Sequence, residues 1–141
     1  MKRILALDVG DRRIGIAVSD PLGITAQGLE TYTRSYDAEK DCEYIIQLLK
    51  KYEPVKLLFG LPKNMNGSLG FQSEKVKAFA ELLTSKWDGE FDFYDERLTT
   101  VAAEKTLYEQ RLNWKERRKV VDKVAAVIIL EGYLASHPVT N

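Results

Sequence analysis

Acidic residues stand at three separated positions where the surrounding pattern predicts the end of a strand or one face of a helix. Asp8 closes an apolar, strand-like run, Asp95 and Glu96 close another, and Asp122 lies in a C-terminal segment with helical periodicity. Carboxylate oxygens are the ligands that hard divalent cations such as Mg²⁺ prefer. Paired metal ions activate water and stabilise the leaving oxygen in phosphodiester cleavage. Three carboxylates with basic neighbours therefore predict metal-dependent nuclease chemistry.

Asp8 shares a strand face with Ile4 and Ala6, where an ionised carboxylate needs a cation or strong hydrogen-bond donors. One interpretation is that Asp8 is a turn residue that prepares the bend before Gly10, because Asp is common in turns. The other is that Asp8 is a metal ligand at the carboxyl end of a strand, where open α/β sheets bind their ligands. The residues alone leave both interpretations open.

Asp95 and Glu96 end a predicted strand just before a helix start that Thr99 and Thr100 can cap. Adjacent strand residues point to opposite faces of a sheet, so only one of the two acids can share a site with Asp8. The pattern does not choose between them. A structural alternative is that the pair favours the positive end of the following helix.

Asp122 shares a helix face with Ala125, Ala126 and Ile129, which follow it at i+3, i+4 and i+7. Small neighbours let such a helix approach a sheet closely. The alternative is an exposed acid among lysines, because most helical charges are exposed to solvent.

Two segments supply donors and positive charge that could hold a phosphate backbone. Residues 60–70 form a glycine-containing loop after a strand, although the loop lacks the Gly-Lys-Ser/Thr ending of a P-loop and the GxGxxG fingerprint. Residues 115–123 are rich in Lys and Arg, and contacts of such residues with phosphate are salt-sensitive. An ordinary mobile loop and a solvated helix face are the alternatives. The predicted nucleic-acid contacts are Arg12, Arg13, Lys63, Asn64, Asn66, Ser68, Arg97, Lys115, Arg118 and Lys119.

Composition excludes several other classes of protein. The 141 residues are 45% hydrophobic and 30% charged, which is typical of one folded domain, and 21 basic residues balance 21 acidic ones. Cys42 is the single cysteine, so an internal disulfide framework and a cysteine-based zinc site are excluded. His137 is the single histidine and leaves little material for a histidine-based site. We expect a cytoplasmic protein, because the longest apolar run is too short to span a membrane and no export signal is seen.

The elements that must position these residues follow from the hydrophobic periodicity, and their order predicts one α/β domain over residues 1–141. Three opening strands form a meander, and the later, helix-linked strands should join them through parallel, right-handed crossovers. The prediction is a mixed five-stranded sheet with helices on both faces. The expected strands are residues 3–9, 13–19, 28–33, 55–61 and 91–94, and the expected helices are residues 37–52, 76–87, 99–112 and 113–134.

Four ordered motifs resemble the YqgF family of Holliday-junction-resolvase-like proteins, which are regarded as nucleases of pre-16S ribosomal RNA. They are LDVGDRRIGIAVSD at residues 7–20, GLPKNMNGS at 60–68, DERLTT at 95–100 and DKVAA at 122–126. The resemblance runs from residue 3 to residue 134. It implies an RNase H-like fold, a bacterial cytoplasmic location and maturation of the 5′ end of small-subunit ribosomal RNA.

The same resemblance implies roles for individual residues. Asp8, Glu96 and Asp122 become the catalytic acids that bind Mg²⁺ or Mn²⁺, and Asp95 becomes a possible substitute or supporting residue. RuvC-type resolvases have a second Asp three residues along their last helix, where this chain has Ala125. Simple phosphodiester hydrolysis is therefore favoured over junction resolution.

Alternative functions come from other classes of protein. The Asp-Val-Gly opening also resembles the phosphate-binding hairpin of actin-like ATPases, but those proteins need two such domains. A Holliday junction resolvase that acts on branched DNA and a non-catalytic nucleic-acid-binding module remain as alternatives. The expected partner is nucleic acid, with a ribosomal RNA precursor favoured over DNA, and no membrane. We expect a monomer or a weak homodimer.

Overall fold

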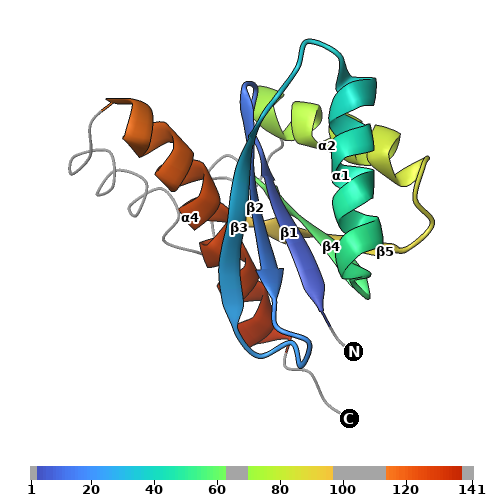
Figure 1. The fold of residues 1–141 in the computed structure, drawn as a ribbon, viewed down its shortest axis with the longest axis vertical. Coiled ribbons are helices and arrows are strands. Elements are labelled where there is room, and N and C mark those ends of the chain that lie inside the picture. The colour runs from blue at the N-terminus through green and yellow to red at the C-terminus, as the bar shows by residue number, and fades with distance from the viewer. Residues whose placement is uncertain (1–2, 63–69, 97–113, 138–141) are drawn as a thin grey trace.

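The computed structural model describes residues 3–62, 70–96 and 114–137, with the side chains of the last segment described from Lys123 onward. Five strands form one sheet in the order β3-β2-β1-β4-β5 (Figure 1). The strands are β1 Ile4–Val9, β2 Arg13–Ser19, β3 Ala26–Thr33, β4 Lys56–Leu61 and β5 Glu90–Asp95, and the helices are α1 Ala38–Tyr52, α2 Phe71–Thr84 and α4 Trp114–Ser136.

Strand direction in the sheet follows from the lengths of the connections. β2 pairs antiparallel with β1 and with β3, because short turns join these strands. β4 pairs parallel with β1, and β5 pairs parallel with β4, because a helix precedes each of these two strands in the chain. β1 is therefore central, with the hairpin partner β2 on one side and β4 on the other. The predicted mixed five-stranded sheet is confirmed.

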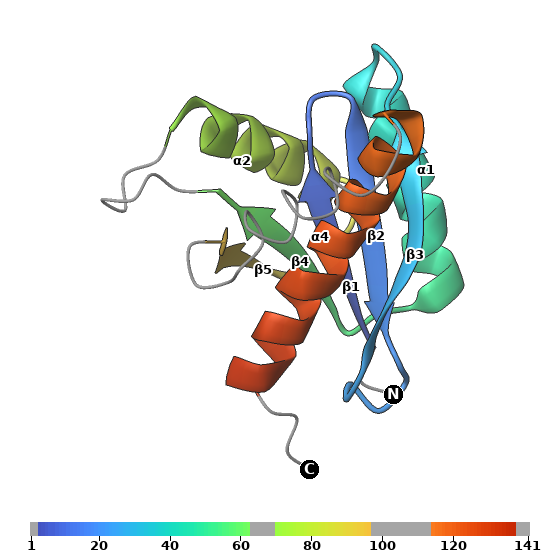
Figure 2. The ribbon, with the colours of Figure 1, turned by 90° about the vertical axis from the view of Figure 1, so that its left-hand side faces the viewer.

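Each face of the sheet has its own apolar core, since side chains alternate along every strand. Leu5, Leu7 and Val9 of β1 pack with α1 and α2, and the core of that face includes Ile45 and Val76. Figure 2 shows α4 crossing the opposite face diagonally.

The core beneath α4 is built from the other set of strand residues. Ile4, Ala6 and Leu58 pack there against Ala126 and Ile129 of the helix, all of which are buried. Helices thus cover both faces, as predicted.

The aliphatic part of the Lys123 side chain on α4 lies over the edge strand β3. A Cβ atom added at Gly28 of β3 would lie 2.7 Å from the Cγ atom of Lys123 and 2.9 Å from its Cδ atom. Real Cβ atoms do not approach other atoms so closely, so a side chain at Gly28 would require the side chain of Lys123 to move.

The structure adjusts several predicted boundaries. β3 begins at Ala26, two residues before the predicted start, and α2 begins at Phe71. Trp87 was expected in the same helix but lies beyond α2, which ends at Thr84. The apolar run in residues 124–130 is helical, as predicted. The predicted helix over residues 99–112 lies outside the described residues. No helix within the described ranges is long and apolar enough to cross a membrane.

A buried ion pair joins α1 to the strand before it and to the turn after β1. Arg34 donates from Nε to Asp41 over 2.9 Å and from Nη1 to the carbonyl oxygen of Gly10 over 2.9 Å. Tyr32 and the backbone amide of Ser35 also donate to the carboxylate of Asp41, each over 2.9 Å. Burial by itself raises the pKa of Asp41, but these hydrogen bonds outweigh it and hold the pKa below the ordinary value of 3.8.

We predict that Asp41→Asn lowers the free energy of unfolding by about 3 kcal/mol near neutral pH, because it leaves Arg34, only 18% exposed, without its anion. The folded pKa of Asp41 is depressed, so its stabilisation is present above the unfolded pKa of about 3.9 and is lost as pH falls through the folded pKa. Urea unfolding should therefore show a constant difference from wild type above about pH 5, shrinking below about pH 4.

The control is Asp88→Asn at an exposed position, which should change the unfolding free energy by less than about 0.5 kcal/mol. Equal losses in the two variants, or a difference that does not shrink in acid, would show that the Asp41 ion pair does not stabilise the fold.

Candidate active site

Asp8 lies near the carboxyl end of the central strand, on the face that α4 covers. It alternates with Ile4 and Ala6, which pack under α4, and its side chain is half-buried. Directly across from it on β2 is Gly15. On β4 the residue after Phe59, the partner of Leu7, is Gly60. Neither neighbour has a side chain, so Asp8 is flanked by glycines on both adjacent strands.

Glu96 lies on the same face of the sheet as Asp8. A Cβ atom added at Gly60 would lie 3.5 Å from the carboxyl carbon of Glu96 and 2.4 Å from Cδ1 of Ile129. Gly60 therefore faces both α4 and the Glu96 carboxyl group. Glu96 is half-buried and directly follows β5, so the side chains of two predicted catalytic acids reach one face from two strands.

Asp95 belongs to the opposite face. It pairs in register with Leu61, which packs in the α1 and α2 core, whereas its neighbour Tyr94 packs beneath α4. Burial raises the pKa of the Tyr94 hydroxyl, and the carboxylate of Asp95 adds to this effect. The alternation of β5 thus distinguishes the two adjacent acids, which the sequence pattern does not.

Asp122 lies in α4, with its side chain outside the described residues. Ala125, Ala126 and Ile129, which follow it at helical spacing, are fully buried against the sheet. Asp122 therefore occupies a position on the helical stripe that faces the sheet. Among the described side chains, no three His, Cys, Asp or Glu residues gather closely enough to hold a metal ion, and this search does not include Asp122.

The predicted nucleic-acid contacts fall into three groups. Arg12 is exposed in the turn between β1 and β2, and Arg13 begins β2 in a half-buried position on the Asp8 face. Lys63, Asn64, Asn66, Ser68 and Arg97 lie outside the described residues, while Lys115, Arg118 and Lys119 lie in α4 with their side chains outside them.

Two residues that sequence analysis set aside lie away from Asp8 in the fold. Cys42 is fully buried in the core beneath α1, and burial raises the pKa of its thiol to about 11. Its prediction as a small core residue is confirmed. His137 follows α4, where its ring stacks on Tyr133 with the ring centroids 4.1 Å apart.

Sequence analysis missed the residues that shape the surroundings of Asp8. Arg34 holds the carbonyl of Gly10, two residues after Asp8, and Asp41 fixes the Arg34 guanidinium. A usable signal was the position of Asp41 beside Cys42 and before Ile45, since an acid in the apolar stripe of a helix needs a buried partner. The glycines that flank Asp8 gave no signal, because strand register is not visible in a single sequence.

The chemistry of the donors at this site fits a divalent cation. The described members are carboxylates, which offer the hard oxygen ligands that Mg²⁺ and Mn²⁺ accept. They are half-buried on one face, and the intervening strand has no side chain at Gly60. An acidic, partly enclosed site of this kind attracts a cation.

Comparison with known sequences identifies close relatives. The sequence model of the RuvX family, described as Holliday junction resolvase, matches residues 2–136. A Clostridium tetani protein named "Putative pre-16S rRNA nuclease" is 53% identical over 134 residues, which cover 95% of this chain and 96% of that protein. A Clostridium botulinum protein of the same name is 54% identical, with 95% and 97% covered.

Comparison with solved structures identifies the fold. RuvC from Thermus thermophilus, solved in complex with a Holliday junction substrate, superposes with a TM-score of 0.60 at 13% identity, and the match covers 99% of each chain. A second structure of Thermus thermophilus RuvC gives a TM-score of 0.53 at 10% identity, with 96% of each chain covered. The expected RNase H-like fold is confirmed.

We predict that Gly60→Ala lowers the free energy of unfolding by about 1–3 kcal/mol, because the new methyl group overlaps the buried Cδ1 atom of Ile129. Ile129→Val removes that atom and should cost about 0.5–1.5 kcal/mol by itself. The double variant should lose less than the sum of the two single variants in urea unfolding. Additivity to within about 0.5 kcal/mol would show that Gly60 and Ile129 do not contact each other.

Proposed function

This chain belongs to the RuvX family, and we propose that it hydrolyses phosphodiester bonds near the 5′ end of pre-16S ribosomal RNA. The names of the clostridial relatives support the RNA substrate. We further propose that residues 1–141 form a single nuclease domain that works in the cytoplasm as a monomer or weak homodimer.

The observation that carries the proposal is the placement of Asp8 and Glu96 on one face of the sheet, beside strand positions without side chains. These two acids and Asp122 are the residues that would hold Mg²⁺ or Mn²⁺. When bound, such a cation supplies Lewis-acid stabilisation of charge on the phosphate and activation of water.

The residues of the chain prepare the site in two ways. β1 pairs with β2 at Asp8 and with β4 as far as Leu7, so the backbone of Asp8 is fixed before substrate binds. Carboxylates repel phosphate, which makes binding of the RNA backbone dependent on compensating positive charge. Arg12 and Arg13, directly beyond the strand end, can supply part of that charge.

Junction resolution is the second candidate, and the description of the matching family favours it. Ala125 stands where RuvC-type resolvases have an additional acid, and Ala125 is fully buried in this chain. A buried alanine supplies no oxygen ligand, so the donor set supports simple hydrolysis of RNA better.

We predict that Asp8→Asn lowers Mg²⁺-dependent cleavage of labelled pre-16S RNA by more than about 100-fold, which exceeds the usual 10–100-fold effect of residues that only support metal ligands. RNA binding measured in EDTA should stay equal or become tighter, because a negative charge near phosphate is removed. A branched DNA junction, incubated in parallel, tests the second candidate.

Asp88→Asn is the matched control at an exposed position beyond α2, and it should cleave as wild type does. Undiminished cleavage by the purified Asp8→Asn protein would contradict the catalytic assignment. Binding of RNA without cleavage under Mg²⁺ or Mn²⁺ would favour a non-catalytic module instead.

We predict a sharp difference between the adjacent acids of β5. Glu96→Gln should reduce cleavage by at least about 100-fold, because Glu96 lies on the Asp8 face, whereas Asp95→Asn should stay within about threefold of wild type, since its side chain is on the other face. The measurement is the single-turnover rate at saturating Mg²⁺. A larger loss for Asp95→Asn would reverse the assignment.

A further inference from the structure

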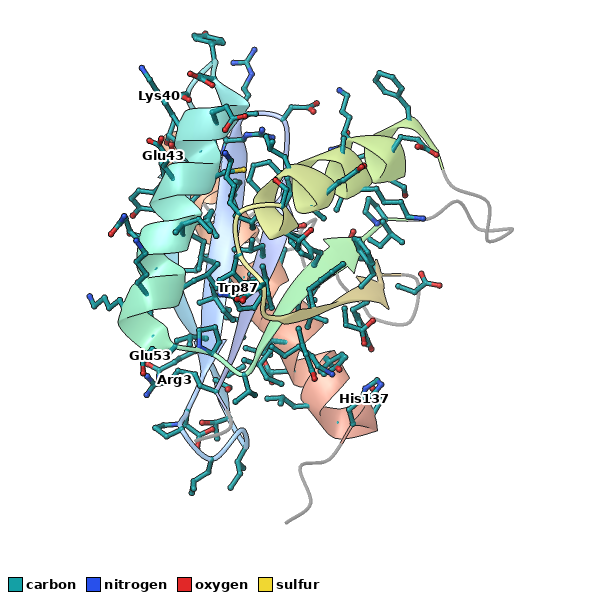
Figure 3. The ribbon with its side chains drawn as sticks, turned by 90° about the vertical axis from the view of Figure 1, so that its right-hand side faces the viewer. Arg3, Lys40, Glu43, Glu53, Trp87 and His137 are labelled. Atoms are coloured by element: carbon teal, nitrogen blue, oxygen red, sulfur yellow. The ribbon has the colours of Figure 1, made fainter. Side chains whose placement is uncertain are left out.

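A pocket of about 360 Å³ opens on the opposite side of the sheet from Asp8. We call it the Arg34 pocket, and its lining includes Gly10, Arg34, Ala38, Gln72, Lys75 and Phe79. Its volume falls within the roughly 300–1,000 Å³ range of small-ligand sites. Figure 3 shows the face on which the pocket lies, which α1 and α2 both cover, with α2 at a wide angle to α1 and Trp87 after the C-terminal end of α2.

The Arg34 pocket adjoins the candidate active site through the backbone of β1. Val9 lines the pocket and directly follows Asp8, so the two sites lie on opposite faces of one strand end. The turn at Gly10, Asp11 and Arg12 follows directly at this end of β1, and Gly10 and Asp11 of that turn line the pocket.

One wall of the pocket suits the face of a planar, aromatic ring. Ala78 and Leu82 supply apolar surface, whereas Phe79 is only 4% exposed and packs behind Arg34. The guanidinium carbon of Arg34 lies 5.0 Å from the centroid of the Phe79 ring, and Asp41 and Gly10 hold the guanidinium in place. Aromatic side chains and guanidinium planes are the surfaces on which proteins stack unpaired bases.

An exposed lysine with an exposed ring beside it lines the pocket. Lys75 is exposed, and its Nζ atom lies 3.0 Å from Asp11 and 4.5 Å from the centroid of the Phe71 ring. Such an exposed ion pair contributes little, so phosphate can replace Asp11 as the partner of Lys75 at small cost. The side chain of Phe71 is 78% exposed.

We propose that the Arg34 pocket binds one unpaired nucleobase of the nucleic-acid strand that continues past the Asp8 site, with Lys75 and Arg12 contacting the adjacent phosphates. The proposal rests on the proposed function for the identity of the strand. It adds that the substrate has a single-stranded segment next to the cleaved bond, because a paired base cannot enter the pocket.

The test is fluorescence anisotropy in EDTA, where no cleavage occurs. The probes are a labelled oligoadenylate of about eight nucleotides, a blunt RNA duplex of about twelve base pairs, and free AMP as competitor. Wild type should bind the single strand about tenfold more tightly than the duplex, and AMP should compete only weakly. Equal affinity for duplex and single strand, or AMP binding as tight as that of the oligomer, would overturn the proposal.

Variants locate the binding to the pocket. Lys75→Ala should weaken single-strand binding by about tenfold and lower the slope of log K against log salt by about 0.7. Lys77→Ala, with the same charge on the same helix outside the pocket lining, should change binding much less. Asp11→Asn should tighten binding because it frees Lys75. An equal effect of the two lysine substitutions would show general electrostatic attraction and overturn the assignment.

Pocket shape and stacking are tested separately. Ala78→Leu, at an exposed helical position, narrows the pocket without changing charge and should weaken binding by about tenfold. Phe71→Ala should weaken binding by about fivefold, because Phe71 lies beside Lys75, whereas Leu22→Ala, 66% exposed in the turn between β2 and β3, should not. Circular dichroism checks that each variant is folded.

The binding measurements test the pocket proposal independently of catalysis. If the pocket variants bind as wild type does while Asp8→Asn abolishes cleavage, the pocket proposal is overturned and the proposed function stands. If binding depends on the pocket but wild type does not cleave, the proposed function is overturned and the pocket proposal stands.

Discussion

The alternation of side chains along β1 is the constraint on which the rest of the structure depends. This strand is paired on both sides and covered on both faces, so its odd-numbered residues belong to the α1 and α2 core and its even-numbered residues to the α4 core. A shift of one residue in register would exchange the two sets. Asp8 would then leave the Glu96 face, and Val9 would leave the Arg34 pocket. The same alternation therefore gives the strand end two surfaces of different chemistry.

The turn that follows Asp8 is anchored to a fully buried carboxylate. The β1 to β2 turn is held by Arg34, whose guanidinium is in turn held by the fully buried Asp41. A buried ion pair contributes little to stability by itself, and a loss of one partner is costly. Its effect here is positional, because it fixes the end of β3, the start of α1 and the turn that follows Asp8 relative to one another.

Periodicity predicted the sheet, its five strands and the helices on both faces, because apolar alternation and helical stripes are local properties of the chain. Asp8 was also predictable, as an acid at the end of an apolar strand. The strand pattern did not choose between Asp95 and Glu96, since the choice depends on which face β5 presents after pairing with β4, and only the family resemblance favoured Glu96. Gly15 and Gly60 matter only through cross-strand neighbours, and the Arg34 pocket is assembled from a turn and two helices far apart in sequence. Long-range register, rather than local propensity, determines these features.

The contact between Gly28 and the side chain of Lys123 ties an outer strand to one residue of α4. Lys123 is the immediate neighbour in sequence of Asp122, the third of the acids proposed to bind metal. A side chain at Gly28 would therefore displace the lysine next to that position. An edge strand with no proposed functional group thus restricts a side chain adjacent to the proposed site, although nothing about the chemistry of glycine indicates it.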